Sequence, residues 1–381
     1  MILGLLAQLV VILIAARIGG LLARALKQPA VVGEMTAGIL LGQFAPQWFG
    51  STEVLTSLSQ IGLILFLFVV GLRLNTQHLA GSGRLVIVTS LVSIVVPFTL
   101  GTALGFFIHP TLGTGTPVVL FSLFIGVATS ITAFPVLARI LRERSMENTP
   151  LGTIAIACSA VDDVSAWLIL AGILAFAHSG KPLPVVFALL CLYLLIIWFC
   201  LRKLAVNWPA ESLTPILLAA FTSSLATEWI GLHAFFGAIA AGAAMPKRPE
   251  WVERVAQKLE PLTLELLLPP FFVLTGFRAH LALLHGWTTW AICLAILCVA
   301  ILGKCGGGMI AARYMGMKWR DSAALGILMN TRGLVELIAL NLGLEAGIIP
   351  PTVFSLMVIM ALVTTLMTTP LLNLIQEKPL T

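Results

Sequence analysis

The sequence predicts an all-α polytopic membrane protein with about thirteen transmembrane helices. Of its 381 residues, 59% are hydrophobic and only 10% are charged, whereas about 25% are charged in a typical soluble domain. The mean hydropathy is +1.05, and the apolar runs are continuous. A transmembrane β-barrel would need alternating apolar and polar residues, so the pattern favours helices. We expect one transmembrane domain over residues 1–381.

Proline, glycine and charged residues separate the apolar runs from one another. Met1 leads straight into the first run with no basic segment before it, so we expect a first span and not a cleavable leader. The second and ninth runs are shorter than the others. The expected spans are 2–25, 29–44, 53–72, 85–108, 117–141, 151–177, 184–201, 211–230, 232–246, 258–277, 287–312, 321–342 and 350–374.

Basic residues predict how the chain is oriented in the membrane. Most of the 22 lysines and arginines fall in loops on one side of these spans. The opposite loops hold only Lys181 and Arg278, while Arg17, Lys304 and Arg332 lie within spans. Because cytoplasmic loops carry the excess of positive charge, we expect the N-terminus outside and the C-terminus in the cytoplasm. In a soluble protein the net charge of +6 would suggest nucleic acid, but here it is explained by orientation, so no nucleic-acid partner is expected.

Two spans contain polar and helix-breaking residues near their middle. The fifth includes Thr129 to Pro135, where a proline interrupts helix hydrogen bonding beside hydroxyl side chains. The twelfth includes Asn330 to Glu336, with an arginine, a glycine and a glutamate. An offset of seven spans makes spans 1–6 and 8–13 two inverted six-helix repeats. Broken helices at matching positions of such repeats are typical of the substrate site of secondary transporters.

Asp162 and Asp163 lie side by side in the sixth span, which carries no other charge. One aspartate at the centre of a transmembrane helix costs about 2.5–3.5 kcal/mol, so a pair indicates binding of an ion or a proton. Adjacent residues point about 100° apart around a helix, so the two carboxylates face different neighbours. In a medium of low dielectric constant both cannot stay ionised cheaply, and their titrations are coupled.

Further polar residues fall at a similar depth. By the helical rise of 1.5 Å per residue, Thr132 lies about 15 Å, Asp163 about 18 Å, Lys304 about 13 Å and Arg332 about 16 Å from the cytoplasmic end of its span. Glycines flank Lys304, and its distance from the span end favours a carboxylate partner over snorkelling.

Other polar groups lie in the two interrupted spans. The hydroxyls of Thr129, Ser130 and Thr132 either complete a cation site at Asp163 or bond back to helix carbonyls. For Asn330, Arg332 and Glu336 we expect bracing of the interruption, with Arg332 and Glu336 spaced to neutralise each other.

Several stretches together resemble the monovalent cation:proton antiporter-2 family, in the branch with cyanobacterial sodium/proton antiporters and plant cation exchangers. Gln43 departs from the family pattern, in which proline is usual. The matching stretches are Gln28 to Gly42, Ala128 to Leu141, Asp162-Asp163, Lys304 with its glycines, and Asn330 to Leu337.

The resemblance implies a thirteen-span fold with crossing broken helices and a homodimer. It implies a dimerisation part at about 1–83 and 211–278, a mobile ion-transport core at about 84–178 and 286–376, and a linker helix at about 184–204. Asp163 would carry the cation, sodium, or the proton, and Asp162 would be paired with Lys304 in one state. Glutathione-gated potassium systems of the family carry Gln-Asp and a soluble nucleotide-binding domain, so nucleotide gating is not expected.

The predicted function is electrogenic exchange of sodium for protons by alternating access, in pH homeostasis across a bacterial inner membrane. A potassium/proton or mixed-cation exchanger remains open, and a sodium-coupled organic-anion symporter is a weaker alternative. An aspartyl protease needs two carboxylates from different helices, so no enzyme is expected. Six cysteines lie in apolar runs without metal-ligand spacing, and we expect no cofactor. The expected partners are the lipid bilayer, monovalent cations, protons and a second copy.

Overall fold

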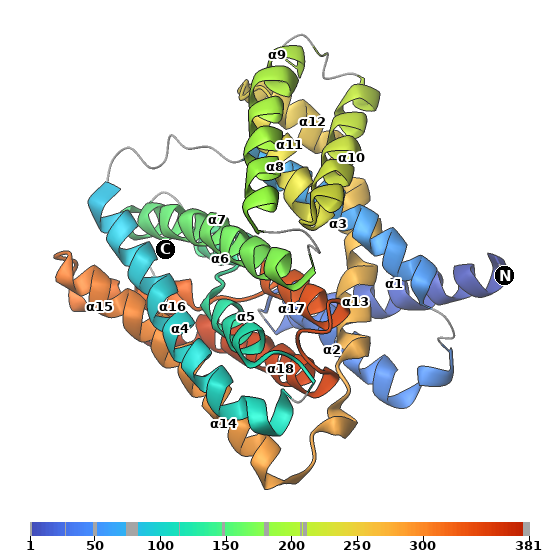
Figure 1. Cartoon of the computed structure of the whole chain (residues 1–381). Coiled ribbons are helices and arrows are strands. Elements are labelled where there is room, and N and C mark those ends of the chain that lie inside the picture. The colour runs from blue at the N-terminus through green and yellow to red at the C-terminus, as the bar shows by residue number, and fades with distance from the viewer. Residues whose placement is uncertain are drawn as a thin grey trace. The chain divides into compact units, whose positions relative to one another are not determined.

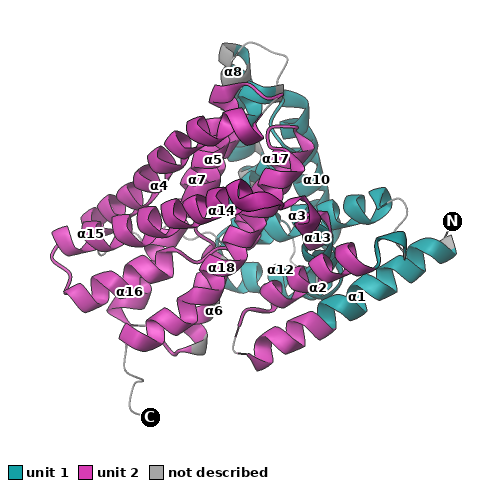
Figure 2. Cartoon of the chain, turned by 90° about the horizontal axis from the view of Figure 1, so that it is seen from below, with its two compact units in different colours: residues 1–17, 45–76, 174–274 teal, residues 18–44, 77–173, 275–381 magenta. Residues whose placement is uncertain are grey.

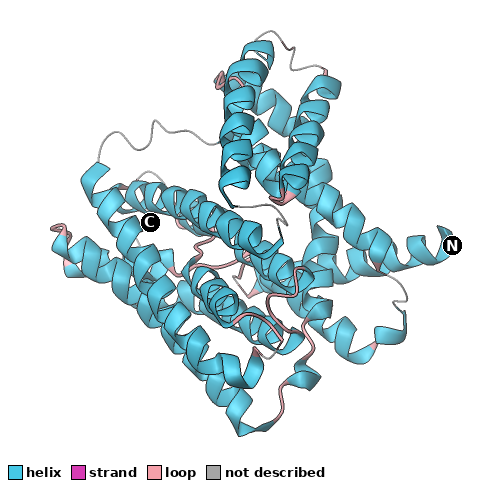
Figure 3. Cartoon of the chain, in the orientation of Figure 1, coloured by secondary structure: helices cyan, strands magenta, loops and turns pink. Residues whose placement is uncertain are grey.

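A computed structural model describes residues 2–26, 28–48, 52–73, 83–113, 115–146, 149–178, 183–205, 208 and 212–375. Every regular element within these ranges is a helix, and none of their residues forms a β-strand (Figures 1 and 3). The predicted all-α class is therefore confirmed.

The helices follow one another closely. Residues up to 205 form α1 (Ile2–Ala25), α2 (Ala30–Phe44), the 3₁₀ turn η1 (Pro46–Trp48), α3 (Glu53–Arg73), α4 (Gly83–Leu112), α5 (Val118–Ser130), α6 (Phe134–Glu143), α7 (Pro150–His178), α8 (Leu183–Ile196), the π-helical turn η3 (Ile197–Leu201) and α9 (Arg202–Ala205). Later residues form α10 (Leu213–Ile230), α11 (Ala234–Ala244), α12 (Pro249–Leu262), the π-helical turn η4 (Thr263–Leu267), α13 (Leu268–Arg278), the 3₁₀ turn η5 (Leu281–Leu283), α14 (Gly286–Ile301), the π-helical turn η6 (Leu302–Gly306), α15 (Gly307–Tyr314), α16 (Trp319–Met329), α17 (Leu334–Glu345) and α18 (Pro351–Ile375).

Eight of the described helices are long and apolar enough to cross a membrane, and α16 and α17 pass the same test together, with a bend of 40° at their break. Four shorter apolar helices, Ala30–Phe44, Val118–Ser130, Ala188–Phe199 and Ala234–Ala244, coincide with other expected spans. The exact count of thirteen stays a prediction.

The helix that contains the tenth expected span begins at Pro249, well before the predicted start at 258. Charged residues such as Glu250 and Lys258 made this part of the sequence look like a loop. The segment is amphipathic instead, because Trp251 and Val255 are buried on one face while charges occupy the other.

The chain divides into two compact units (Figure 2). Unit 1 comprises Met1–Arg17, Ala45–Thr76 and Leu174–Leu274, and unit 2 comprises Ile18–Phe44, Gln77–Ile173 and Thr275–Thr381. The assignment of dimerisation, core and linker parts stays a prediction.

In unit 1, α3 packs closely on α11. A Cβ at Gly242 would meet the backbone of Phe68, so glycine permits this approach. The ammonium of Lys247 donates to the carbonyls of Gly71 and Leu72, at 2.8 Å each, at the C-terminal end of α3. A lysine there satisfies carbonyls that the helix itself leaves unpaired.

In unit 2, α4 packs against α5 and against the long helix formed by α14, η6 and α15 (Figure 1). A Cβ at Gly303 in η6 would lie 2.8 Å from the Cα of Pro97 in α4. Glycine at this position thus brings α4 directly beside the π-helical turn that carries Lys304. All the fully buried charged side chains among the described residues belong to this unit.

Candidate ion-binding site

Two broken helices of unit 2 meet at their interruptions. Residues 131–133 separate α5 from α6, and residues 330–333 separate α16 from α17. The N–H of Ala133 donates to the carbonyl of Thr331 over 2.8 Å, so one interruption is bonded to the other. Both predicted interruptions are present, and their backbone groups are available to side chains because no helix uses them.

The break in the fifth span, at residues 131–133, lies before its proline, Pro135. Ile131 is extended, with φ −69° and ψ 139°, and Ala133 caps the next helix with extended geometry. Pro135 lies in the first turn of α6, where its missing N–H leaves no internal helix bond unmade. The proline therefore starts α6. The expectation that it interrupts a turn inside a helix was wrong.

Lys304 lies in η6 with a fully buried side chain. Its Nζ donates to Asp162 Oδ2 over 2.7 Å, to the carbonyl of Ser93 over 3.0 Å and to the carbonyl of Ser130 over 2.5 Å. An ammonium has three donors, so the described contacts use all of them. π-Helical turns within α-helices are frequent at functional sites.

The Ser93 carbonyl is free to accept because of a proline in α4. In an α-helix that carbonyl would receive the N–H of residue 97, but residue 97 is proline and has no N–H. The ammonium of Lys304 donates a hydrogen bond to this carbonyl instead. Ser93 and Pro97 were not predicted as site residues, although a proline inside an apolar span indicates an unpaired carbonyl four residues earlier.

Asp162 and Asp163 face different surroundings. The hydroxyls of Thr132 and Ser93 lie 2.9 Å and 3.2 Å from Asp162 Oδ2, beside the ammonium of Lys304. Asp163 instead accepts a hydrogen bond from the N–H of Phe134, the first residue of α6. The N-terminal end of a helix attracts anions through its free N–H groups and its dipole.

Asp163 is the more open of the two carboxylates. As a residue it is 8% exposed, against 0% for Asp162. No residue in the described ranges donates a hydrogen bond to Asp163 Oδ1. Oδ1 of Asp162 likewise receives no hydrogen bond from the described residues. The two carboxylates differ instead in their partners, because Asp162 is paired with a buried ammonium and Asp163 accepts a backbone N–H.

The hydroxyls of the fifth span were expected either to complete a cation site at Asp163 or to bond to helix carbonyls. Thr129 Oγ1 lies 3.0 Å from the carbonyls of Pro97 and Ile125, and Ser130 donates to Val127 over 2.8 Å. These two hydroxyls therefore bond to backbone carbonyls and do not point into a site at Asp163. Thr132 reaches the carboxylate pair, but it contacts Asp162.

Arg332 ties the second interruption to the end of α5. Its guanidinium donates to the carbonyls of Ala128 over 2.7 Å and Thr129 over 2.5 Å. Its Nη1 lies 3.3 Å from Glu336 Oε1, as the i,i+4 spacing predicts. Asn330 is buried beside this interruption. The guanidinium thus caps the negative end of a half-helix.

The hydroxyl of Thr365 in α18 holds the backbone of the same interruption. It accepts from the N–H of Arg332 over 3.2 Å and donates to the carbonyl of Arg332 over 2.8 Å. The role of this threonine could not be read from the sequence, where it is one of many hydroxyls in an apolar span.

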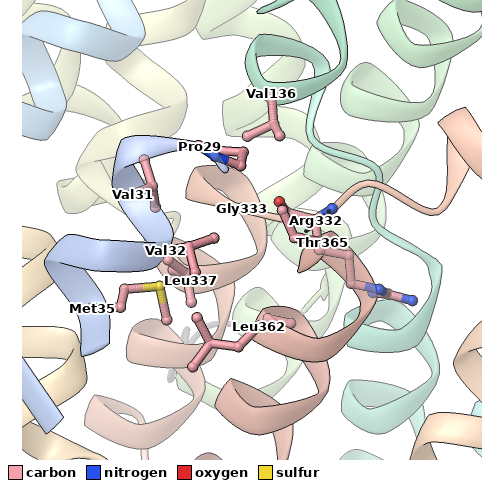
Figure 4. Close-up of a pocket in the computed structure, with 11 residues that line it drawn as sticks. Pro29, Val31, Val32, Met35, Val136, Arg332, Gly333, Leu337, Leu362 and Thr365 are labelled. Atoms are coloured by element: carbon pink, nitrogen blue, oxygen red, sulfur yellow. Dashed lines mark hydrogen bonds between the residues drawn. The ribbon is translucent and has the colours of Figure 1, made fainter. Parts of the chain in front are cut away.

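A small pocket lies beside the interruption, and Figure 4 shows its lining from α2, α6, α17 and α18. Most of the lining is apolar, and the Arg332 side chain extends away from Val31 and Met35. Neither aspartate nor Lys304 lines this pocket. The pocket is therefore not the place where a cation would meet Asp163. Within the described ranges no group of three or more His, Cys, Asp or Glu residues is arranged to hold a metal ion.

Known proteins are similar to this chain in sequence and in fold. Residues 10–374 match the family described as sodium/hydrogen exchanger, transmembrane. A Na⁺/H⁺ antiporter, NhaS4 of Synechocystis, is 40% identical over 98% of this chain and 97% of its own length. Cation/H⁺ antiporter 17 of Arabidopsis thaliana is 37% identical over 96% of the chain, which spans about half (48%) of that relative.

The fold also has a solved counterpart. The structure of the sodium proton antiporter MjNhaP1 from Methanocaldococcus jannaschii aligns with a TM-score of 0.68 over 97% of this chain and 95% of that one, at 16% identity. At that identity the likeness supports the fold alone. With the family match over nearly the whole chain, the resemblance predicted from the motifs is confirmed, and the chain is an integral membrane protein that belongs to the sodium/hydrogen exchanger family.

Proposed function

We propose that the chain exchanges sodium ions for protons across a membrane by alternating access, with Asp163 binding either ion. The observation that carries the proposal is the contrast between the two buried carboxylates. Asp162 is paired with the ammonium of Lys304, whereas the described partner of Asp163 is a backbone N–H that leaves its charge uncompensated. The family match and the antiporter activity named for the cyanobacterial relative support the same conclusion.

The coupling follows from charge. With Asp162 and Lys304 neutralising each other, Asp163 leaves the site negative unless it holds a proton or a cation. A net charge buried in a membrane protein is costly, so the empty site crosses poorly while either loaded site crosses. A proton and a sodium ion compete for the same oxygen, which couples the two fluxes. Release of a proton when the Asp162–Lys304 contact opens would make the exchange electrogenic.

Replacement of Asp163 by asparagine tests the carrier assignment. We expect Asp163→Asn to reduce sodium-driven proton flux in proteoliposomes to background, because an amide neither titrates nor attracts a cation. Asp321→Asn, which removes a carboxylate in the first turn of α16, should retain exchange. Undiminished flux in Asp163→Asn would contradict the proposal.

The transported cation is sodium in this proposal, and potassium is the alternative. Oxygen ligands accept either ion, and the plant relative is named only for cations. Flux measured with sodium, potassium or lithium against a proton gradient separates the two, and a membrane-potential dye tests charge movement.

We further propose a homodimer in a bacterial cell membrane that serves pH homeostasis, with ion transport in the predicted core. The concentration of the buried charges in unit 2 supports a core that carries the site. Thr129, Ser130 and Thr132 remain candidates for cation contact through another conformation of the interruption, while Asn330, Arg332 and Glu336 brace it.

A further inference from the structure

Glu336 is a titratable group that the exchange mechanism leaves unused. It lies in the first turn of α17, and its side chain is completely buried. Its described partner is Arg332, whose Nη1 lies 3.3 Å from Oε1. No other described residue donates a hydrogen bond to the two carboxylate oxygens. An ionised carboxylate in this setting lacks the donors that usually compensate for burial.

The charged groups around Glu336 are few. Arg332 lies in contact with it at 3.3 Å, and Lys304 is the other cation that acts on it. The helices packed against α17 add no others, because α5 and α18 contain no charged residue. In α2, Glu34 lies against Gly20 of α1. At the far end of α17, Glu345 pairs with Arg278 over 2.7 Å.

We propose that Glu336 is a proton-binding group separate from the Asp162–Asp163 pair, and that its protonation changes the hold of Arg332 on the C-terminal end of α5. This inference rests on the proposed function. The ionised carboxylate attracts the same guanidinium that donates to the carbonyls of Ala128 and Thr129. Uptake of a proton removes that competing attraction and leaves Arg332 to the carbonyls.

The effect reaches the ion site through direct contacts. The next carbonyl of α5, that of Ser130, accepts from Lys304, which pairs with Asp162. A change at Glu336 therefore alters the C-terminal end of α5, which binds Lys304, the partner of Asp162. Glu336 lies in the first turn of α17, where the helix dipole acts on its charge.

The isosteric variant Glu336→Gln gives a distinctive expectation. Glutamine is neutral at every pH, so it reproduces the protonated state. The transport rates of the variant and the wild type, plotted against pH, should coincide at acidic pH. At alkaline pH they should differ by about threefold or more, which is half a unit on a logarithmic scale. Glu345→Gln on the same helix is the matched control and should leave the difference between acidic and alkaline rates unchanged. Curves that overlay at all pH values, or differ by one constant factor, would overturn the proposal.

A second measurement does not depend on transport. In the Asp163→Asn background, the infrared difference spectrum between acidic and alkaline samples should contain a band from a protonated buried carboxyl. That band should disappear when Glu336→Gln is added and persist with Glu345→Gln. A band that survives Glu336→Gln, or no such band at all, refutes proton binding at Glu336. Failure of the proposed function would show itself separately, as exchange that persists in Asp163→Asn alone.

Discussion

The ammonium of Lys304 is fully buried, yet every one of its three donors has an oxygen acceptor. This is the condition under which a buried ion pair is tolerated, because each remaining donor must be satisfied. Two of the three acceptors are backbone carbonyls freed by a proline in α4 and by the end of α5. The pairing with Asp162 thus depends on two interruptions of helix hydrogen bonding as well as on opposite charge.

Removal of one member of this pair should cost more than removal of both. Lys304→Gln leaves a buried carboxylate without its cation, and we expect a loss of about 3–5 kcal/mol in stability. Asp162→Asn combined with Lys304→Gln removes both charges and should recover part of that loss, which a double-mutant cycle quantifies. Thermal unfolding of the purified protein in detergent provides the measurement, with Lys318→Gln as an exposed control. If the losses simply add, the pair is not coupled.

The charged residues of this site could be named from the sequence because a charge inside an apolar span is costly and therefore conspicuous. Asp162, Asp163, Lys304 and Arg332 all met that criterion. The free-energy cost of placing a hydroxyl in a membrane span is small by comparison, and hydroxyls are common in such spans. Their partners depend on which helix lies beside them, so Thr365 escaped notice and Thr129 could not be assigned.

At the scale of helices, α18 holds the second interruption in place through one side chain. Thr365 bonds both the N–H and the carbonyl of Arg332, and therefore fixes the backbone from which the guanidinium extends. The element that positions Arg332 is thus a neighbouring helix and not α16 or α17 alone.

Thr365→Val should lower the rate of exchange several-fold and reduce stability by about 1–3 kcal/mol, since it leaves buried backbone groups unpaired at nearly constant side-chain volume. Thr368→Val is the matched control: its hydroxyl is equally buried in the same helix but donates only to the carbonyl of Thr364. Exchange rates in proteoliposomes and unfolding temperatures compare the two. Equal effects on exchange would show that Thr365 has no special role in positioning Arg332.

Element boundaries were less predictable than the elements. The location of both interruptions followed from polar and helix-breaking residues, but Pro135 served to start α6 and not to break α5. The early start of α12 was missed because its charges resembled a loop. In both cases the outcome depends on which face of a short helix finds a neighbour, and a single sequence does not contain that information.

Over the whole molecule, charge asymmetry in the loops remains the basis for orientation. The loop that joins α13 to α14 should lie outside and the loop that joins α15 to α16 in the cytoplasm, because Arg313, Lys318 and Arg320 cluster near the second loop. The helix between them, formed by α14, η6 and α15, runs from Gly286 to Tyr314 and is long enough to span a membrane once. The two loops must therefore face opposite sides if this helix crosses the bilayer.

Labelling of introduced cysteines tests this orientation. His285→Cys and Lys318→Cys place exposed thiols at the two ends of the helix, in a background without the native cysteines, all of which lie in apolar runs. A membrane-impermeant maleimide added to intact cells should label position 285 and not position 318, and inverted vesicles should give the reverse. The cysteine-free parent should stay unlabelled and keep exchange activity. Labelling of both positions from one side would contradict a single crossing, and the opposite pattern would reverse the orientation that the basic residues predict.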